Sequence, residues 1–435
     1  MLQEGTIYAD EFPVGLTGGV AVGVGKKQRK DTFMMLKDKT VILGVTGGIA
    51  AYKSAALASM LVHEGADVRV IMTEHAQNFI HPLTFETLTG HKCICNTFDR
   101  SFEYNVAHVE LAKRADVVMV APATANVIAK LAHGIADDML TTTFLASSAP
   151  KMIVPAMNTG MYENPIVQEN LSLLQKFGME VVPPTSGRLA CGDVGVGKMP
   201  EPEVLREHLL RCVAYKKDLA GQRILITAGP TQEKIDPIRY ITNHSSGKMG
   251  YSIARICMLR GANVTLVTGK TCLTPPMFVD VVEVVTAKEM FDAVSSVHEN
   301  MDVIIKTAAV ADYRPTNAAD EKIKKSKQSL SIALERTEDI LQYLGNHKKP
   351  GQFLCGFCME TQDLLGYAQE KFEQKHLDMI VANHLKEAGA GFGTDTNRVA
   401  LLTKDGVEQL PLMHKQDVAM TLMDRIVSLQ RGCLI

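Results

Sequence analysis

The chain has 435 residues, about three times the length of an average domain, so we expect two or three domains rather than a small single-motif protein. Lys and Arg number 46 against 48 Asp and Glu, and a net charge of −2 argues against nucleic acid or an anionic membrane as the main partner. Every apolar run ends well short of about 18 residues, so the sequence predicts no transmembrane helix.

The nine cysteines are odd in number and scattered, and no secretory signal precedes them. This pattern is typical of reduced thiols in the cytoplasm. Two close pairs, Cys93 with Cys95 and Cys355 with Cys358, would suit metal or redox chemistry. No second CxxC or His pair lies at ligand spacing, so we favour core packing and identify no metal ligand.

Residues 1–36 show neither strand alternation nor a helical period. Acidic residues at Glu4, Asp10 and Glu11 argue against a secretory or transit peptide. We predict a disordered extension with a solvated basic cluster, and an ordered chain from about Lys37.

From residue 37 onward, short apolar strands alternate with helical segments. In 37–219 the strands TVILGV, DVRVIMT, DVVMVAP and KMIVPAM frame helices expected at 48–64 and 126–146. Such alternation predicts an α/β fold with a parallel sheet covered on both faces. A second doubly wound, Rossmann-like α/β domain is expected at 220–435, where RILITAG restarts the pattern after a helix stop signal at Leu219–Gly221.

Polar or Gly-rich turns follow two strands of the first domain. Thr46, Gly47 and Gly48 open a helix, whose bare amides and positive end suit a phosphate. The spacing differs from the GxGxxG of dinucleotide sites, so a mononucleotide phosphate fits better than NAD. Thr124 and Asn126 follow another strand, at the edge where open α/β sheets bind ligands. A tight structural turn is the alternative for the first of these clusters.

Three further features of this domain are His108, Asn158 in the string PAMN, and Cys191 in the Gly-rich loop SGRLACGDVGVGKMP. Taken singly, each has a structural explanation as a surface or core histidine, a turn former or a packed thiol. Together with TGGIAAYK and APATANVIAKLAHGIADDML, the strings PAMN and ACGD resemble the flavin-dependent cysteine decarboxylases, specifically the phosphopantothenoylcysteine decarboxylases.

This resemblance implies a flavodoxin-like flavoprotein domain that binds FMN. Oxidation of the thiol-bearing carbon to a thioaldehyde would let the carbanion left by CO₂ loss delocalise onto sulfur. His108 would assist proton or hydride removal, Asn158 would hold the substrate carboxylate, and Cys191, in a mobile loop, would donate a proton. The FMN contacts carried over are Thr46, Gly47, Gly48, Thr73, Thr124 and Asn126.

The second domain carries the strings AGPTQEKIDPIRYITNHSSGKMG, KTAAVADYRP, EKIKKSK, TEDI, GFCMET and EKFEQKHLD. In this order they resemble phosphopantothenate–cysteine ligase. Joining a carboxylate to an amine needs a better leaving group, which a nucleoside triphosphate supplies by forming an acyl nucleotidylate and pyrophosphate. The lysines of EKIKKSK suit a loop that closes over a triphosphate, with a solvated basic loop as the alternative. A P-loop is excluded because the GK strings lack its pattern.

By this resemblance Asn243 would hold the acyl nucleotidylate, supported by Arg239 and Lys322. The nucleotide positions carried over are Lys306, Thr307, Ala308, Ala309, Asp312, Lys322, Asp339, Ile340, Phe357, Lys371 and Lys375, with Asp312 as a reader of the base amino group. Bacterial family members favour CTP, and triphosphate chemistry implies Mg²⁺, for which the sequence shows no carboxylate cage. Cys358 and Met359 replace the small alanines usual in the family, which leaves nucleotide preference open.

The two resemblances, in this order, are those of the bifunctional coenzyme A biosynthesis proteins. They imply a cytoplasmic homo-oligomer, with trimeric flavoprotein domains and dimeric ligase domains, that acts on 4′-phosphopantothenate, cysteine and CTP. PAMN and ACGD argue against a flavin prenyltransferase, and the missing GxGxxG argues against an NAD-dependent reductase. A regulatory flavoprotein without activity is disfavoured because His108, Asn158 and Cys191 occur together with an intact ligase half.

Overall fold

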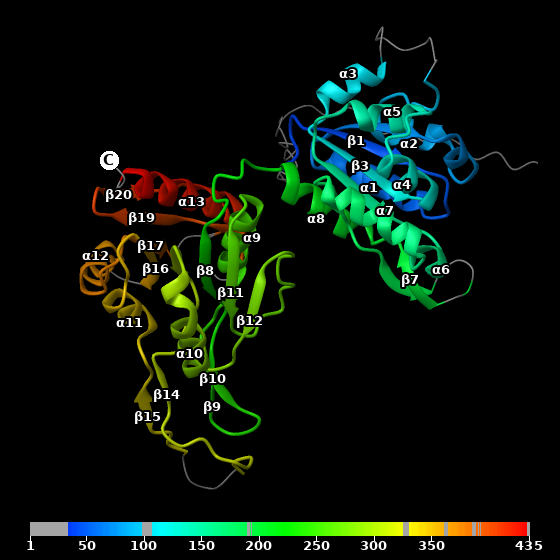
Figure 1. The fold of residues 1–435 in the computed structure, drawn as a ribbon. Coiled ribbons are helices and arrows are strands. Elements are labelled where there is room, and N and C mark those ends of the chain that lie inside the picture. Colours follow the sequence, from blue (N-terminus) through cyan, green and yellow to red (C-terminus); the bar gives the residue numbers. More distant parts are fainter. Residues whose placement is uncertain are drawn as a thin grey trace, which may run out of the picture.

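The first domain is built on a parallel sheet whose strand order determines where a ligand can bind. The computed structural model describes residues 34–97, 107–188, 192, 194–324, 330–360, 364–384, 389, 391 and 393–432. Five parallel strands lie in the order β2-β1-β3-β4-β5 (Figure 1). Their bounds are β1 Thr40–Val45, β2 Asp67–Met72, β3 Val117–Ala123, β4 Lys151–Pro155 and β5 Glu180–Val181. This is the flavodoxin-like order, whose ligand crevice lies at the carboxyl ends of β1 and β3.

Helices cover both faces of this sheet. They are α1 Ala51–His63, η1 Glu74–Asn78, α2 Pro82–Thr89, α3 Ala107–Arg114, α4 Ala125–Ala132, α5 Met139–Ala146, α6 Thr159–Tyr162, α7 Pro165–Lys176 and α8 Pro202–Val213. Leu43 of β1 packs in one hydrophobic cluster with Leu57 of α1, whereas its neighbour Ile42 packs in another with Ile128 of α4. Successive strand residues point to opposite faces, so each face acquires its own core.

The second domain has an eight-stranded sheet in the order β12-β11-β8-β13-β16-β17-β19-β20. The strands are β8 Arg223–Ala228, β11 Asn263–Thr268, β12 Asp280–Glu283, β13 Val303–Lys306, β16 Phe353–Glu360, β17 Met379–His384, β19 Val399–Thr403 and β20 Gly406–Gln409. The first six in the sheet are parallel, and β19 and β20 are antiparallel. Their sequence reverses between β8 and β13 as in a Rossmann sheet, which puts the ligand crevice there.

Two groups of helices cover this second sheet. Its helices are α9 Lys248–Leu259, α10 Ala287–Val297, η2 His298–Asn300, α11 Ile340–Asn346, α12 Leu364–Gln374 and α13 Lys415–Gly432. Ile226 of β8 shares a cluster with Ile253 of α9 and Leu422 of α13, whereas Leu225 shares another with Leu341 of α11. The two groups of helices therefore cover opposite faces of the sheet, and each face has its own core.

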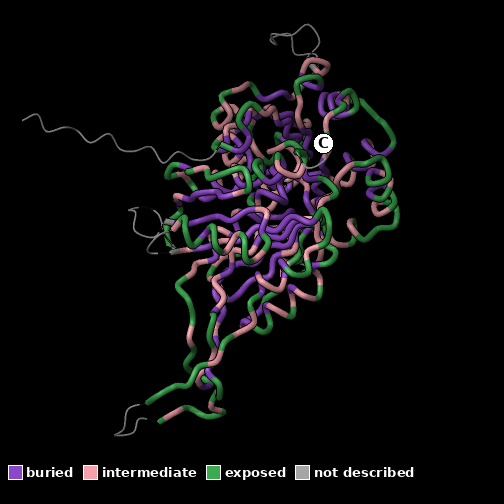
Figure 2. Tube along the Cα trace, turned by 90° about the vertical axis from the view of Figure 1, so that its left-hand side faces the viewer, coloured by how far each residue is buried: buried purple, intermediate pink, exposed green. Residues whose placement is uncertain are grey.

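Two short hairpins project from the second domain and form an extension that we call the arm, seen at the bottom of Figures 1 and 2. Its strands are β9 Gln232–Lys234, β10 Tyr240–Thr242, β14 Tyr313–Pro315 and β15 Leu334–Arg336. The hairpins are joined where the Ala319 amide donates to the Ile235 carbonyl at 2.9 Å. Six large apolar residues are exposed along the arm: Ile238, Tyr240, Tyr313, Leu330, Ile332 and Leu334. Such an apolar face suits contact with another protein surface.

Two further hairpins are small. The strands β18 Thr396–Asn397 and β21 Met413–His414 pair antiparallel, and α13 begins directly after β21. In the first domain, β6 Thr185–Arg188 pairs with β7 Val194–Lys198. The stretch SGRLACGDVGVGKMP, which we expected to be a Gly-rich loop, therefore contains most of the two strands of a hairpin.

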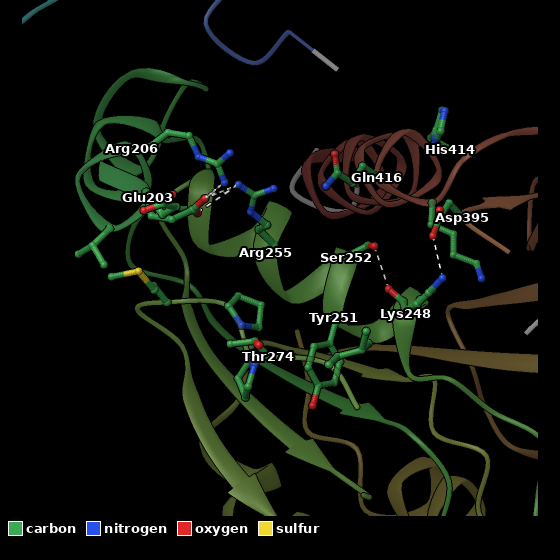
Figure 3. Close-up of a pocket in the computed structure, with 17 residues that line it drawn as sticks. Glu203, Arg206, Lys248, Tyr251, Ser252, Arg255, Thr274, Asp395, His414 and Gln416 are labelled. Atoms are coloured by element: carbon green, nitrogen blue, oxygen red, sulfur yellow. Dashed lines mark hydrogen bonds and ion pairs between the residues drawn. The ribbon is translucent and has the colours of Figure 1, made fainter. Parts of the chain in front are cut away.

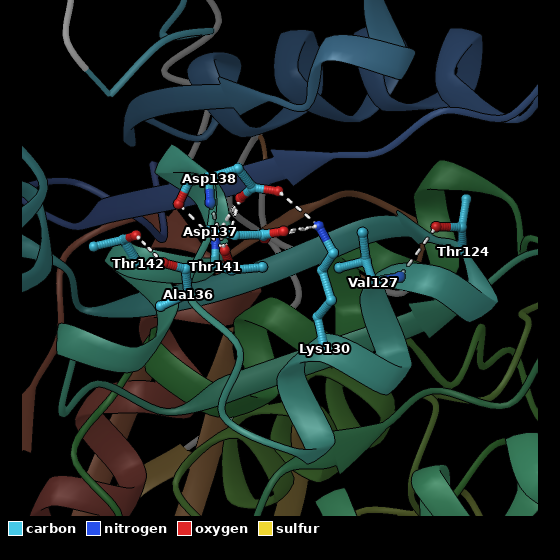
Figure 4. Close-up of polar contacts among 8 residues, drawn as sticks. All are labelled: Thr124, Val127, Lys130, Ala136, Asp137, Asp138, Thr141 and Thr142. Atoms are coloured by element: carbon cyan, nitrogen blue, oxygen red, sulfur yellow. Dashed lines mark hydrogen bonds and ion pairs between the residues drawn. The ribbon is translucent and has the colours of Figure 1, made fainter.

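The single helix expected at 126–146 is wrong, because the chain forms α4 and α5 there. Gly134 adopts φ +70°, a conformation that glycine tolerates and that ends α4. Asp138 then caps α5 by accepting a hydrogen bond from the Thr141 amide at 2.8 Å, as part of a capping box (Figure 4). Periodicity alone did not separate the two helices.

The turn between α4 and α5 is held by Lys130. Its ammonium lies 2.7 Å from Asp137 and 3.8 Å from Asp138, and the hydrogen bond from Lys130 lowers the pKa of Asp137 (Figure 4). Part of the family-like string that ends in ADDML therefore has a structural role.

The N-terminal boundary of the ordered chain differs slightly from our expectation. Residues 1–33 of the expected extension lie outside the described residues, but Met35 and Leu36 are buried. The Leu36 amide donates to the Glu64 carbonyl at 3.0 Å, so the core begins before Lys37. None of the cysteines in the described residues forms a disulfide, and within the same residues no helix combines the length and apolar character that crossing a bilayer requires.

Candidate functional site

A cavity of about 540 Å³ occupies the crevice of the first domain. Four of the predicted site residues line it, namely Gly47, Gly48, Thr124 and Asn158. Its walls also carry three cations that the prediction did not include: Lys53, Arg188 and Lys198. Their positive charge and the N termini of α1 and α4 suit an anionic ligand.

Thr46 ties the two strands that flank the crevice. Its fully buried hydroxyl donates to the Pro122 carbonyl at 2.8 Å and accepts from the Thr124 amide at 3.1 Å. Thr46 therefore holds the ends of β1 and β3 together but does not itself line the cavity. Asn126, on the exposed side of α4, does not line it either.

The turn after β1 brings the main chain close to the cavity. A Cβ at Gly47 would lie 2.6 Å from the Cβ of His75, whereas nothing lies within 4 Å of the corresponding position at Gly48. Thr73 precedes η1, and its buried hydroxyl has no hydrogen-bond partner in the protein. A buried hydroxyl normally bonds to something, so this one suits a ligand or a water.

Lys53 is a site residue that the prediction missed. Although 95% buried, its ammonium donates to the Met199 carbonyl at 2.9 Å and lies 2.9 Å from the Glu201 carboxylate. The hydrogen bond from Lys53 lowers the pKa of Glu201. The only signal in the sequence was its place at the end of the string TGGIAAYK, one turn into α1.

Asn158 lies where the β6–β7 hairpin meets the end of β4. Its Oδ1 accepts from the Gly160 amide at 2.8 Å, which fixes the orientation of the side-chain amide. The Met157 amide donates to the Gly197 carbonyl at 3.0 Å, and a Cβ at Gly197 would lie 2.2 Å from the Met157 oxygen. Cys191, which stands between β6 and β7 in the sequence, lies outside the described residues.

The chain does not bring His108 to this cavity. His108 lies in the first turn of α3, which packs against α5. In Figure 1, α3 is at the top of the first domain and β7 is at its bottom. His108 and Asn158 therefore belong to opposite ends of the domain within one chain.

A second cavity, of about 440 Å³, occupies the crevice of the second domain, and we call it the ligase-side cavity. The turn from His244 to Gly250 that opens α9 forms one wall. Eight of the predicted positions line it: Asn243, Lys306, Thr307, Ala308, Ala309, Asp312, Phe357 and Lys371. The replaced residues Cys358 and Met359 line it as well.

Hydrogen bonds fix the strand ends that frame this cavity. The Thr307 hydroxyl donates to the Thr227 carbonyl at 2.6 Å, and the Ala308 amide donates to the Thr227 hydroxyl at 3.2 Å. Asn243 donates its side-chain amide to the carbonyls of Ala309 and Val310 at 3.3 and 3.0 Å. The Asn243 side chain is thereby held against the turn that follows β13.

Lys306 is the most perturbed cation of the predicted set. Burial lowers its pKa to about 8, the charge of Asp339 opposes this shift, and the charge of Lys375 adds to it. Asp339 caps α11 by accepting from the Gln342 amide at 3.0 Å and pairs with Lys375 at 2.7 Å. Asp339, Ile340 and Lys375 thus lie beside the cavity, close enough to act on its charge, without lining it.

Arg239 and Lys322 are not at this cavity, although we predicted that they act together with Asn243. Arg239 donates to the Ile323 carbonyl at 2.8 Å and pairs with Asp236, whose pKa it holds well below the usual range. The Ile323 amide donates to Asp236 at 3.2 Å, so both predicted residues belong to the arm. The neighbouring lysines 325 and 327 lie outside the described residues.

Asn383 is a second residue that the prediction missed. It lies on β17 opposite Met359, its side chain is more than nine-tenths buried, and its Oδ1 has no hydrogen-bond partner in the protein. It lines the ligase-side cavity. A usable signal was present, because the strand DMIVANH ends in polar residues at the carboxyl edge.

The residues that the structure describes do not form a cluster of metal ligands. Among the described residues, no three His, Cys, Asp or Glu side chains are grouped so that they could hold a metal ion.

Two family models match the chain. Residues 30–213 match the family described as Flavoprotein. Residues 219–429 match the DNA/pantothenate metabolism flavoprotein C-terminal domain.

Curated relatives match almost the whole chain. A coenzyme A biosynthesis bifunctional protein CoaBC of Bacillus subtilis is 47% identical over 401 residues, which cover 91% of this chain and 98% of that protein. The protein of the same name from Escherichia coli is 43% identical over 398 residues, with the same coverage of 91% and 98%.

Solved structures match one domain at a time. The C-terminal domain of a CoaBC protein is 46% identical, with a TM-score of 0.43, and covers 49% of this chain and 98% of that one. A Cys-to-Ser mutant of PPC decarboxylase, complexed with pantothenoylaminoethenethiol, is 32% identical, with a TM-score of 0.36 and coverage of 39% and 96%.

Proposed function

Because the chain belongs to the family of the bifunctional coenzyme A biosynthesis proteins CoaBC, and so combines phosphopantothenate–cysteine ligase with phosphopantothenoylcysteine decarboxylase, we propose how its two cavities divide this work. The ligase-side cavity binds CTP and 4′-phosphopantothenate, and the cavity of the first domain binds FMN and the cysteine adduct. A purely regulatory flavoprotein is not favoured.

The contact between Asn243 and the turn after β13 carries the ligase proposal. It holds the Asn243 amide in the same cavity as Lys306 and Asp312. A carboxylate oxygen of the substrate attacks the α-phosphorus of CTP, a new P–O bond forms, and pyrophosphate leaves with the electron pair. The cysteine amine then displaces CMP from the acyl cytidylate. Asn243 holds the acyl cytidylate, and Asp312 accepts from the base amino group.

Mg²⁺ enters this proposal with the triphosphate. Mg²⁺ prefers oxygen ligands and usually keeps several waters. The buried Asn383 Oδ1, which has no partner in the protein, supplies an oxygen of the required kind next to where the phosphates would lie. The phosphates, water and this oxygen fit the ion better than a carboxylate cage would.

The cavity of the first domain fits a flavin mononucleotide. The open space at Gly48 and the Lys53 ammonium suit a phosphate and a polar ring, whereas Thr73, a predicted contact whose hydroxyl has no partner in the protein, does not line this cavity. When bound, FMN supplies the two-electron oxidation and the later reduction. Asn158 holds the substrate carboxylate with its amide nitrogen, and Cys191 donates a proton.

Two copies of the chain are needed to complete both sites. His108 lies at the opposite end of the domain from Asn158, so a shared decarboxylase site requires His108 from a neighbouring copy. The arm carries Arg239 and Lys322 together with exposed apolar residues such as Ile238 and Tyr240. The arms would pair in a dimer, so that Arg239 and Lys322 of one copy lie over the ligase-side cavity of another copy. The flavoprotein domains would form a trimer, in which His108 of one copy reaches the cavity of its neighbour. A cytoplasmic location stays a prediction.

The test is mass spectrometry of products formed from 4′-phosphopantothenate, cysteine, CTP and Mg²⁺ by the purified protein. We expect 4′-phosphopantetheine. Accumulation of phosphopantothenoylcysteine alone would contradict the decarboxylase assignment, and product with ATP but not with CTP would contradict the nucleotide assignment.

The variant Cys191→Ser tests the proton donor. Ligation should persist in it while decarboxylation stalls after oxidation, and normal output of 4′-phosphopantetheine would overturn the role of Cys191.

A further inference from the structure

Another cavity, larger than the ligase-side cavity, adjoins it and shares two lysines with it. This groove, of about 750 Å³, lies between α8 of the first domain and α9 and α13 of the second (Figure 3). Arg255 and Glu207 pair across it at 2.9 Å. Lys248 and Lys415 line both cavities, so they form the partition between them.

Both lysines stand at positions that are unfavourable for a cation in isolation. Lys248 is the first residue of α9 and Lys415 is the first residue of α13. The N terminus of a helix carries partial positive charge, which repels an ammonium. Two ammonium groups and two helix N termini therefore concentrate positive potential at the partition.

Contacts with one segment fix the two ammonium groups. Lys248 donates to the Gly393 carbonyl and lies 2.8 Å from the Asp395 carboxylate, a pair drawn in Figure 3. Lys415 donates to the carbonyls of Gly391 and Thr394 at 3.0 and 2.6 Å. Burial and, next, the charge of Lys248 lower the pKa of Lys415 to about 8, as expected of two cations held close together.

A further observation at the same place points to a ligand. The buried Asn383 Oδ1 lies in the ligase-side cavity with Lys415 and has no partner in the protein. An oxygen without a donor beside clustered ammonium groups suits a polyanion that carries its own cation, as a magnesium-bound polyphosphate does. Lys306 and Lys371 line the same cavity, so four lysines surround it among the described residues.

We propose that Lys415 and Lys248 form the subsite for the β- and γ-phosphates of the nucleoside triphosphate. The inference rests on the proposed ligase function and adds the residues that receive the leaving group. As the carboxylate oxygen bonds to the α-phosphorus, the bond from that phosphorus to the bridging oxygen breaks. The electron pair passes to pyrophosphate, and the two ammonium groups stabilise the added negative charge.

The test measures the binding of inorganic pyrophosphate and of CMP to the full-length protein by calorimetry. Lys415→Gln and Lys248→Gln should each weaken pyrophosphate binding about tenfold or more, as expected for loss of a charge-assisted contact. Binding of CMP, which lacks both phosphates, should change less than about twofold, and Lys415→Arg should restore part of the pyrophosphate affinity. Lys404→Gln, on the exposed turn between β19 and β20, is the matched control and should leave both affinities unchanged.

Two outcomes would overturn the inference. Unchanged pyrophosphate binding in both variants would remove the lysines from the subsite. Equal weakening of pyrophosphate and CMP would mean that Lys415 only holds the segment from Gly391 to Asp395 in place. Failure of the proposed function would look different, because the wild-type protein itself would then form no phosphopantothenoylcysteine from CTP. Decarboxylation of supplied phosphopantothenoylcysteine checks that each variant is folded.

Discussion

The side-chain amide of Asn243 donates to the main-chain carbonyl of Val310 at 3.0 Å, which joins the turn after β10 to the turn after β13. Asn243→Asp keeps the size of the side chain but turns a carboxylate toward carbonyl oxygens. We expect ligation to fall about 10- to 100-fold, because a lost hydrogen bond and the repulsion that replaces it cost about 1–3 kcal/mol. Coupled measurement of CMP release tests this.

The control for Asn243 is Asn346→Asp, at the exposed end of α11. It should leave ligation unchanged, and both variants should decarboxylate supplied phosphopantothenoylcysteine normally. Equal loss of both activities in Asn243→Asp would point to misfolding rather than to a role in the ligase site.

Gly197 seats the β6–β7 hairpin beside Asn158. Its φ of +140° disfavours any side chain, and a Cβ would meet the Met157 oxygen at 2.2 Å. Gly197→Ala should therefore reduce decarboxylation at least about tenfold while ligation persists, since strain of about 1–3 kcal/mol must be relieved by moving the hairpin. Gly187→Ala is the control in the same hairpin, because its Cβ would find only Lys198 Cδ at 3.7 Å. Normal decarboxylation by Gly197→Ala would contradict this account.

Lys53 gives a prediction about flavin binding. Lys53→Met removes a buried ammonium from the cavity, but it leaves behind Glu201, whose side chain is 56% exposed and remains solvated. We expect the purified variant to lose about tenfold or more in FMN affinity with little change in unfolding temperature, given that a charged hydrogen bond is worth about 1.5–3 kcal/mol. Flavin absorbance after gel filtration measures this. Lys176→Met, on the exposed side of α7, should keep its flavin, and full retention by Lys53→Met would exclude a cofactor contact.

Lys306 gives a prediction about pH. Its pKa of about 8 lies below the usual 10.5, so the unfolded chain binds more protons between these values. The contribution of Lys306 to stability therefore rises with pH from about 8 to 10.5 and is constant below that window. CTP affinity should change in the opposite sense and fall as pH rises through 8, because the charged form attracts phosphates.

Chemical modification tests the same group directly. At pH 7 about a tenth of Lys306 is uncharged, so an acylating reagent should modify it faster than exposed lysines, and CTP should protect it. Peptide mapping after a short exposure provides the measurement. In Lys306→Arg the fall in CTP affinity near pH 8 should become smaller, and it should disappear when Lys415→Arg is added, because the pKa of Lys415 is also lowered to about 8. An undiminished fall in Lys306→Arg would show that Lys306 does not contribute to it.

The sequence was sufficient to predict two mainly parallel sheets, because their longer parallel strands are short apolar runs that end in turn residues. It did not predict the short β5 or the antiparallel strands β19 and β20. TVILGV and RILITAG each open a domain, and each proves to be the strand next to the point where strand order reverses. The residues that follow these strands, and those that follow β3 and β13, were therefore identifiable as crevice residues before any contact was known.

Other site residues depended on contacts that no local pattern encodes. The position of His108 follows from the packing of α3 against α5, and that of Arg239 from a bond to Ile323, 84 residues further along the chain. Lys53 reads as an ordinary lysine of an amphipathic helix until Met199 and Glu201 fold over it. Long-range packing thus decided which candidates of the correct chemical type reached a cavity.

The attachment of the β6–β7 hairpin to the end of β4 has a consequence for which residues of this enzyme can change. The hairpin is held to the end of β4 by a main-chain hydrogen bond between Met157 and Gly197, at a point where glycine leaves room for close approach. Main-chain seating specifies the position of the hairpin but not the sequence or length of its tip. Substitutions between β6 and β7 that leave Gly197 in place should therefore keep the hairpin attached beside Asn158.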